Sequence, residues 1–507
     1  MSTEFLLLIA TLAIVFYIWQ RRAFSFWQRH GVKFIQPLPV LGCTREFLTA
    51  RVPFFEQLKK FHEAPGFEKE PFVGVYLAYK PALVVRDLDL IKTVMIKKFQ
   101  YFHNRVLQTD PHDALGFNNL FFARSPEWKE LRNKISPVFT SGKIKQMYPL
   151  MVKIGKDLEN SADRLAGGSV PIKNLCARFT TDLIATIAFG VEANALKNVK
   201  SEFFHHNQAI FAVTWSRAID FTIIFMLPAL VSIARVKLFS KETTKFIRNT
   251  INYVLAERER TGVKRNDLVD ILLALKREAE TNPDQKNKYK DLDYLVAQAA
   301  IFQTAGFETS SSTMTLTLYE LVKNESIQDR LRQEITDYFG DEDHISYERI
   351  QEMPYLSQVV NETLRKYPIV GYAERQCAQP EEGERFTLEP HHSMELPHGM
   401  PVYVSALAIH HDPQYWPEPE KFDPERFDPA NRSNLNMDAY MPFGVGPRNC
   451  IGMRLGLLQS KLGLVHLLRN HRVHMSDQTP KTIQWAATSP VIASKHEIAL
   501  RLEKVSS

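Results

Sequence analysis

The sequence predicts a mainly α-helical protein with a small β-sheet region, and three observations support this class. Helical periodicity dominates from about residue 86 onward, whereas strand-like patterns are confined to short stretches. Residues 291–324 form a long stretch with few charges in its middle, which predicts a helix buried at the centre of the fold. The 507 residues are 45% hydrophobic and 24% charged, as in packed globular proteins.

The first element is an apolar run over residues 5–19, followed by Arg21 and Arg22. The acidic Glu4 at its start and bulky residues at its end argue against cleavage as a signal peptide. The run is short for a spanning helix of roughly 20 residues, so an amphipathic helix at the membrane interface is the alternative. Basic residues after the run place the rest of the chain on the cytosolic side. We expect residues 1–22 to form a membrane anchor.

After the anchor, residues 23–42 form a basic and proline-rich linker, in which prolines fix the direction of the chain. Aromatic residues at its start are expected at the membrane interface: Phe24, Phe26 and Trp27. Short strands are predicted over residues 72–76 and 82–85, and a small sheet within residues 373–406. Residues 43–507 are expected to form the catalytic domain.

Cysteine content and charge exclude several classes. The four cysteines are too few and too scattered for a disulfide framework, which suits a reducing compartment. The net charge of +6 is modest for this length, and no concentrated basic stripe predicts nucleic-acid binding.

The strongest chemical motif is F-x-x-G-x-R-x-C-x-G over residues 443–452. Its glycines allow tight turns and close approach to a flat ligand. Cys450 precedes a predicted helix over residues 453–468, and a helix N-terminus stabilises the thiolate that ligates a metal. A thiolate ligand of haem iron donates electron density that favours O–O cleavage. A buried structural cysteine is the alternative.

This motif resembles the cysteine-ligand loop of the cytochrome P-450 superfamily, and the resemblance covers essentially the whole chain. Other similar segments follow in the family's order: W-x-x-x-R at 128–132, A-G-x-E-T at 305–309, E-x-x-R at 362–365 and P-E-R-F at 424–427. Residues 139–143 and 409–413 are similar to microsomal family-six enzymes of insects, which act on foreign compounds. The resemblance implies the cytochrome P-450 fold, with haem b between the long central helix and the cysteine-ligand loop.

The resemblance also implies a set of haem-binding residues, with Cys450 as the axial ligand of the iron. The haem propionates need cations, and Trp128 and Arg132 lie four apart on one predicted helix face, directed to the same point. Three further arginines are implied by the resemblance alone: Arg375, Arg448 and, as a looser match, Arg105. Glu374, beside Arg375, is expected to place a charge near the substrate pocket.

On the central helix, the small residues Ala305 and Gly306 are expected to leave room for dioxygen, and Gly306 to permit a local widening of the helix. Thr309 lies four residues after Ala305, on the same face. By the resemblance, Ala305, Gly306 and Phe443 contact the cofactor, the Thr309 hydroxyl passes protons and Glu308 supplies them. The alternatives are that Thr309 only bonds back to its own helix and that Glu308 is a buried charge partner.

Two other polar groups have structural explanations. Glu362 and Arg365 share one helix face, and Arg426 is the candidate third group that satisfies this buried pair. The adjacent His410 and His411 invite an axial-ligand interpretation, but the Asp-Pro that follows predicts a turn and no second haem motif accompanies them.

The sequence therefore predicts a haem-thiolate monooxygenase in the endoplasmic reticulum membrane, with its catalytic domain facing the cytosol. Its substrates would be lipophilic, foreign compounds such as insecticides and plant toxins above all. Because the chain lacks a nucleotide-binding glycine motif, electrons from NADPH would come through a separate flavoprotein reductase, with cytochrome b5 as a second candidate donor. A basic outer face would steer the reductase: Lys129, Lys134, Lys143, Lys145 and Arg454.

Three alternatives keep the haem. They are oxidation of endogenous terpenoids or hormones, a thiolate-haem isomerase or dehydratase that needs no NADPH, and a non-catalytic haem protein that binds a lipophilic ligand or a gas.

Overall fold

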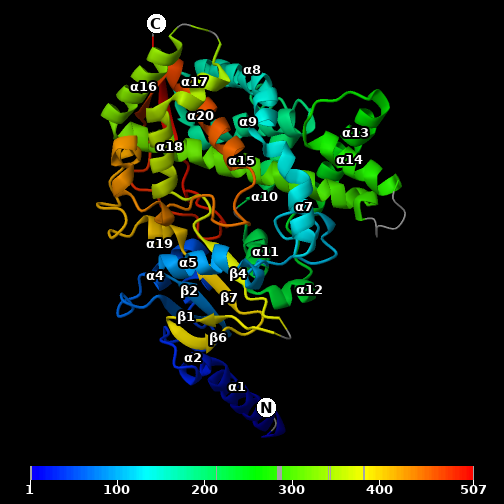
Figure 1. Ribbon diagram of the computed structural model, residues 1–507, viewed down its shortest axis with the longest axis vertical. Helices are drawn as coiled ribbons and strands as arrows, with labels where there is room; N and C mark the ends of the chain where they lie inside the picture. Colours follow the sequence, from blue (N-terminus) through cyan, green and yellow to red (C-terminus); the bar gives the residue numbers. More distant parts are fainter. Residues whose placement is uncertain are drawn as a thin grey trace. The chain divides into compact units, whose positions relative to one another are not determined.

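The computed structural model of the protein describes residues 3–212, 214–281, 288–340, 342, 344–380 and 383–505. The chain forms two compact units. The sheet unit comprises residues 1–106, 370–415 and 437–449, and the helical unit comprises residues 107–369, 416–436 and 450–507. Helices dominate the described residues (Figure 1), which confirms the predicted fold class.

The sheet unit is built on a four-stranded sheet of order β1-β2-β7-β4. β1 (Phe72–Leu77) and β2 (Lys80–Val85) are antiparallel, β7 (Pro401–Val404) lies parallel to β2, and β4 (Ala373–Gln376) is antiparallel to β7. This arrangement confirms the predicted strands. The unit also contains the β5–β6 pair (Thr387–Leu388, His392–Glu395) and short helices: α2 (Phe26–Arg29), α3 (Arg45–Leu48), α4 (Phe54–His62), α5 (Leu88–Lys92) and α19 (Ala406–His410).

The N-terminal helix α1 (Thr3–Phe24) is longer than the apolar run that predicts it. At 1.5 Å per residue its 22 residues extend about 33 Å, close to the roughly 30 Å of a membrane's hydrocarbon core. Glu4 in its first turn and Arg21 and Arg22 in its last turn suit the helix dipole. Among the described residues, α1 is the one helix long and apolar enough to cross a membrane.

The segment after α1 packs on the sheet, and for Trp27 this differs from the expected place at a membrane interface. Trp27 is fully buried, and its indole N–H donates to the Val75 carbonyl at 2.9 Å. A Cβ added at Gly74 would lie 2.7 Å from the Trp27 ring, so the glycine makes room for it. The Tyr76 hydroxyl donates to the Phe24 carbonyl at 2.8 Å. The beginning of the predicted linker is therefore part of the folded sheet unit.

The core of the helical unit is α15 (Leu292–Lys323), which confirms the predicted central helix. Its N-terminus is capped by the Asp291 side chain, which accepts a hydrogen bond from Asp293 N. α9 (Ile172–Ile184) and α20 (Met453–Asn470) lie beside it (Figure 1). A three-stranded antiparallel sheet of order β3-β9-β8 belongs to the same unit.

The other elements of the helical unit complete its bundle. They are α6 (Ala114–Phe117), α7 (Glu127–Ile135), α8 (Ser141–Leu165), β3 (Ser169–Pro171), α10 (Glu202–Ile210), α11 (Trp215–Met226), α12 (Val231–Ala234), α13 (Lys241–Thr261), α14 (Leu268–Thr281), α16 (Glu325–Phe339), α17 (Tyr347–Glu352), α18 (Pro354–Lys366), β8 (His471–Met475) and β9 (Ala499–Lys504).

Candidate active site

Cys450 differs from the other three cysteines in its exposure. Its side chain is exposed, whereas Cys176 and Cys377 are buried and Cys43 is half-buried. Burial raises the pKa of the Cys176 and Cys377 thiols to about 12 and that of Cys43 to about 11. Thiols with such pKa values stay protonated at neutral pH, and only thiolates ligate metals. Cys450 is the exposed one of the four cysteines, and it stays the predicted ligand.

The loop before Cys450 is turned by glycines, as predicted. Gly444 and Gly446 have φ values of 70° and 76°, a region that other residues rarely adopt. A Cβ at Gly446 would lie 2.1 Å from the Met95 carbonyl oxygen, so this position admits only glycine. On the other side of Cys450, Gly452 is the N-cap of α20, which confirms the predicted helix.

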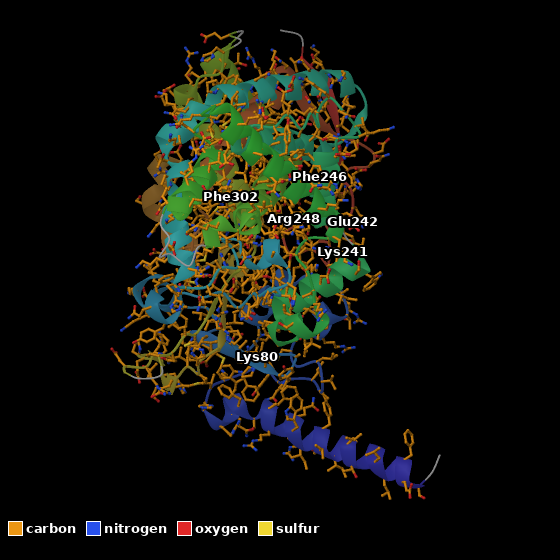
Figure 2. The ribbon with its side chains drawn as sticks, turned by 90° about the vertical axis from the view of Figure 1, so that its right-hand side faces the viewer. Lys80, Lys241, Glu242, Phe246, Arg248 and Phe302 are labelled. Atoms are coloured by element: carbon orange, nitrogen blue, oxygen red, sulfur yellow. The ribbon has the colours of Figure 1, made fainter. Side chains whose placement is uncertain are left out.

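In the helical unit, α20 and the loop before it are joined to α15. The Gln459 side-chain amide on α20 donates to the Gly306 carbonyl at 3.0 Å. Phe139 stacks on Phe302 with ring centroids 5.1 Å apart, and a Cβ added at Gly452 would lie 3.7 Å from the Phe139 ring. Figure 2 labels Phe302 on α15. The helix that follows the candidate ligand is thus fixed against the predicted oxygen-binding segment.

One side of α15 is exposed, although most of the helix is buried. Ala305 is exposed, and the neighbouring residues at helical spacing are half-buried: Ile301, Phe302, Gly306 and Thr309. We call these five residues the open stripe. A stripe of small and apolar residues along a buried helix suits the face of a flat, largely apolar cofactor.

Gly306 has a packing contact that the sequence did not predict, and one expectation about this residue is wrong. A Cβ added there would lie 2.5 Å from Ile184 Cδ1 on α9, so the absent side chain allows close helix packing. Room for dioxygen stays a prediction for the pair Ala305 and Gly306, and Ala305 is the exposed one of the two. α15 also continues as a regular α-helix through this position, without the predicted widening.

Thr309 and Glu308 point to different sides of α15. The Thr309 hydroxyl donates to the Ala305 carbonyl at 2.7 Å, so it shares the stripe with Ala305 as predicted but bonds back to its own helix. Glu308 is only 6% exposed, and its carboxylate accepts a hydrogen bond from Lys173 Nζ on α9 at 2.8 Å. Consecutive residues on a helix lie about 100° apart. The structure brings Thr309 to the stripe and makes Glu308 a buried charge partner.

In the sheet unit, Arg375 on β4 is a buried cation with unused hydrogen-bonding capacity. It is 2% exposed, one of its terminal nitrogens donates to the Glu374 carbonyl at 2.7 Å, and its Nε has no partner among the described residues. Burial lowers the pKa of its guanidinium to about 10. Such a group suits an anionic ligand such as a propionate.

Arg105 has a carboxylate partner within the same unit. Its Nη1 lies 2.7 Å from Glu374 Oε1, and Glu374 Oε2 accepts the Val106 N–H at 2.6 Å. Arg105 therefore offsets the charge of Glu374, which the sequence predicted to lie near the substrate pocket. Arg105 fits the propionate role less well than Arg375.

The other predicted cofactor residues are divided between the units. In the helical unit, Trp128 is buried and Arg132 is half-buried, and both lie on α7 four residues apart. In the sheet unit, Phe443 is half-buried and Arg448 is buried, with its Nε donating to the His103 carbonyl at 2.9 Å.

The predicted charge cluster at α18 is confirmed. Glu362 and Arg365 are fully buried and joined by two bonds, of 2.7 Å and 3.0 Å, and Arg426 Nε lies 3.5 Å from Glu362. Burial raises the pKa of Glu362. The sequence did not predict that Arg365 also donates to the carbonyls of Pro419 and Lys421.

The buried His410 has a structural role. Its Nε2 accepts the Met441 N–H at 2.9 Å, and its ring stacks on Tyr440. These contacts give His410 a structural role in place of the axial-ligand role that the sequence analysis already disfavoured.

Three residues of the site region were missed from the sequence: Lys173, Phe139 and Gln459. Phe139 belongs to the segment 139–143, which was noted only for its similarity to the family, without a role for this residue. Lys173 and Gln459 carry no local motif, because their partners lie 135 and 153 residues away along the chain.

The comparisons with known proteins show a family. The family model described as Cytochrome P450 matches residues 32–497. The chain is 78% identical to the protein named "Probable cytochrome P450 6w1" of Drosophila melanogaster, over 99% of this chain and 98% of that protein. It is 44% identical to "Probable cytochrome P450 6v1" of the same species, over 99% of both chains. It is also 36% identical to "Cytochrome P450 6k1" of Blattella germanica, over 98% of this chain and 97% of the other.

Proposed function

The chain belongs to the cytochrome P450 family, and on this premise we propose that it is a membrane-anchored haem-thiolate monooxygenase for lipophilic foreign compounds. That it is a cytochrome P450 monooxygenase follows from the family. The anchoring, the electron donor and the substrates are the proposal. The single observation that supports the role of Cys450 is its exposed position two residues before the N-cap of α20, whereas the other three cysteines are buried or half-buried.

We propose the predicted residues as the ones that would hold haem b. Cys450 would ligate the iron, and the propionates would be met by Arg375, Arg448, Trp128 and Arg132. Arg105 stays the looser candidate of this set, because it is ion-paired with Glu374. The open stripe, with Ala305 at its centre, and Phe443 would contact the ring. Bound haem supplies the activation of dioxygen, and the thiolate favours cleavage of the O–O bond.

The protein's own contribution at the open stripe is to exclude water and move protons. Ile301 and Phe302 make one end of the stripe apolar, which suits lipophilic substrates. Thr309 would pass protons into the site through its hydroxyl, which turns from Ala305 O when it takes part. Glu308 would supply those protons from solvent after leaving its present ion pair.

Anchoring by α1 would hold the enzyme on the endoplasmic reticulum with its catalytic part in the cytosol. The exposed apolar side chains of α1 and the arginines in its last turn support this placement. Electrons would come from NADPH through a separate flavoprotein reductase, with cytochrome b5 as a second donor.

The first test replaces the candidate ligand. Cys450→Ser should yield protein without the CO-bound, reduced absorption spectrum that thiolate ligation produces, because a hydroxyl does not supply the anionic sulfur. Cys43→Ser is the matched control and should keep that spectrum. An unchanged spectrum in Cys450→Ser would refute the proposed ligand.

A product screen tests the substrate class. Full-length protein with reductase and NADPH should oxidise several plant toxins and insecticides. Oxidation confined to endogenous terpenoids or hormones would contradict the foreign-compound role. Conversion without NADPH would favour an isomerase or a dehydratase.

A further inference from the structure

The helix that carries Trp128 and Arg132 also has a charged face. Glu127, Glu130 and Lys134 recur at the spacing i, i+3, i+7, which places them on one side of α7. At 100° per residue, this side lies roughly 150° around the helix from Trp128 and Arg132. α7 therefore presents its expected propionate donors on one face and a row of charges on the nearly opposite face.

The charged face of α7 is held by the short segment before α15. The Tyr289 hydroxyl donates to Glu130 Oε1 at 2.8 Å. Lys288 Nζ lies 3.4 Å from Glu130 Oε2 and 3.6 Å from Glu127 Oε1. The Lys134 ammonium lies over the Tyr289 ring, 5.0 Å from its centroid. We call Lys288 and Tyr289 the clamp.

The clamp is fixed to the start of the central helix. The Asp291 N–H donates to the Lys288 carbonyl at 3.1 Å, and Asp291 is the N-cap of α15. The Tyr289 ring packs edge-on against Tyr294 in the first turn of α15, with ring centroids 5.4 Å apart. The charged face of α7 is thus tied to the buried helix at the core of the same unit.

Burial indicates which contact of the clamp holds α7 most firmly. Tyr289 is 3% exposed, whereas the side chains of Lys288 and Glu127 are 22% and 59% exposed. Ion pairs at the surface contribute little, because water and salt screen them. A hydrogen bond from a hydroxyl to a carboxylate is among the stronger ones. The bond between Tyr289 and Glu130 is therefore the main hold of the clamp.

We propose that Tyr289 is a positioning residue for haem binding: through Glu130 it sets the rotation of α7 about its axis, and with it the places of Trp128 and Arg132. The inference rests on the proposed function, which assigns those two residues to the haem propionates. A roll of about 20° would displace a side-chain end about 5 Å from the helix axis by roughly 2 Å, enough to break a hydrogen bond.

The first measurement is the rate of haem transfer from the holoenzyme to an excess of apomyoglobin. Tyr289→Phe removes the hydroxyl and keeps the ring. It should speed the transfer about tenfold, the size expected for one lost hydrogen bond to a charged group. Tyr253→Phe, a substitution of an exposed tyrosine on α13, is the matched control and should transfer haem at the wild-type rate. Equal rates in Tyr289→Phe and the wild type would overturn the proposal.

Combined variants ask whether the effect runs through α7. Glu130→Leu should speed haem transfer as well, and adding Tyr289→Phe to it should change nothing further, because the bond is already lost. The effect of Tyr289→Phe should also vanish in a protein that carries Trp128→Phe and Arg132→Gln. An undiminished effect in that protein would contradict a role through these two residues and would overturn the proposal.

The reduction potential of the iron separates positioning from a merely structural role. A nearby cation favours the reduced iron, because the ferrous ion carries less positive charge than the ferric ion. Displacement of Arg132 in Tyr289→Phe should therefore shift the potential downward. A lower thermal unfolding midpoint with an unchanged potential would make Tyr289 structural only and would overturn the proposal.

Crystal structures of the haem-loaded wild type and Tyr289→Phe give a reading that does not depend on rates. α7 should be rolled in the variant, with Trp128 and Arg132 displaced, and an unmoved α7 would overturn the proposal. If Trp128→Phe with Arg132→Gln transfers haem at the wild-type rate, the propionate role of these residues in the proposed function fails. The crystal comparison would still decide whether Tyr289 sets the position of α7.

Discussion

The exposure and the hydrogen-bond partners of single side chains indicate which of them can bind a ligand or move a proton. Cys450 is exposed, whereas the other cysteines are buried or half-buried. Arg375 is a buried cation whose Nε has no partner among the described residues. The Thr309 hydroxyl donates its hydrogen bond to a helix carbonyl. Glu308 shows the opposite condition, because Lys173 and Ser312 occupy its carboxylate. The resemblance that picks out these positions does not indicate which of them are already paired.

At the residue scale, Thr309→Ala should keep haem and substrate binding and divert electrons from NADPH to hydrogen peroxide. The reason is that a missing hydroxyl slows proton delivery, by an amount on the order of 10²-fold for a lost acid–base group. The measurement is product and peroxide formed per NADPH consumed. Thr313→Ala, one turn further along α15 and buried, is the control and should stay coupled. Full coupling in Thr309→Ala would refute its role in proton delivery.

Elements are held in place by pairs that lie far apart in the sequence. Gln459 ties α20 to α15, Arg365 ties α18 to the segment around residue 420, and Trp27 ties the segment after α1 to β1. Each link joins a side chain to a backbone carbonyl. Every residue has a backbone carbonyl group, so no sequence motif marks the acceptor, and these links could not be predicted from the sequence.

At the element scale, Arg365→Lys should destabilise the helical unit. Removing one partner of a buried ion pair costs about 3–5 kcal/mol, and lysine cannot make the bonds of Arg365 to Glu362 and to two carbonyls together. Arg472→Lys is the control, since its pair with Asp329 is partly exposed and such pairs contribute about 0–1 kcal/mol. Urea unfolding followed by haem absorbance measures both. Equal midpoints for the two variants would contradict this account.

A pair of truncations separates the anchor from the fold. Removing residues 3–22 should release much of the protein from membranes while haem content persists, because this segment exposes its apolar side chains. Removing residues 3–30 should also lose haem, because the buried Trp27 goes with it and loss of a buried aromatic side chain costs about 3–5 kcal/mol. Membrane fractionation and haem content per protein decide. Haem loss in the shorter truncation would make α1 part of the fold.

At the scale of the whole chain, local patterns predicted the class of fold and the ligand loop, but not the packing between distant segments. The period of residues 291–324 predicted α15, and the glycine spacing of residues 443–452 predicted a turned loop before a helix. The sequence could not show that Gly306 serves contact with Ile184, since that depends on how two helices pack. Nor could it show that Glu374 neutralises Arg105, 269 residues away.

Packing also revises the predicted docking face for the reductase. Lys134 pairs with Glu278, Lys145 pairs with Glu348, and Lys143 donates to Asn266. The carboxylate partners offset the charges of Lys134 and Lys145, whereas the bond of Lys143 to an amide leaves its charge in place. Lys129 and Arg454 are exposed on α7 and α20, and Arg454 donates to the neutral Ser141 Oγ at 3.1 Å, which leaves its charge in place.

We expect Lys129→Glu combined with Arg454→Glu to lower turnover with the reductase, more strongly at low salt, because exposed charges act on association. Turnover driven by an organic peroxide should survive, since it needs no electron donor. The pair Lys134→Glu and Lys145→Glu, whose lysines are ion-paired on the same chain, is the comparison and should have the smaller effect on association. Equal loss in both assays would indicate structural damage, and no loss in either would place docking elsewhere.

The buried guanidinium of Arg375 has a consequence for how the protein is made. A cation at 2% exposure with an unpartnered nitrogen is costly until an anion meets it, and a ligand that binds only the folded chain stabilises that chain by mass action. Haem would then act during biosynthesis as well as in catalysis. The amount of protein that accumulates in a cell should follow that cell's supply of porphyrin precursor, and chains that outrun the supply should be degraded.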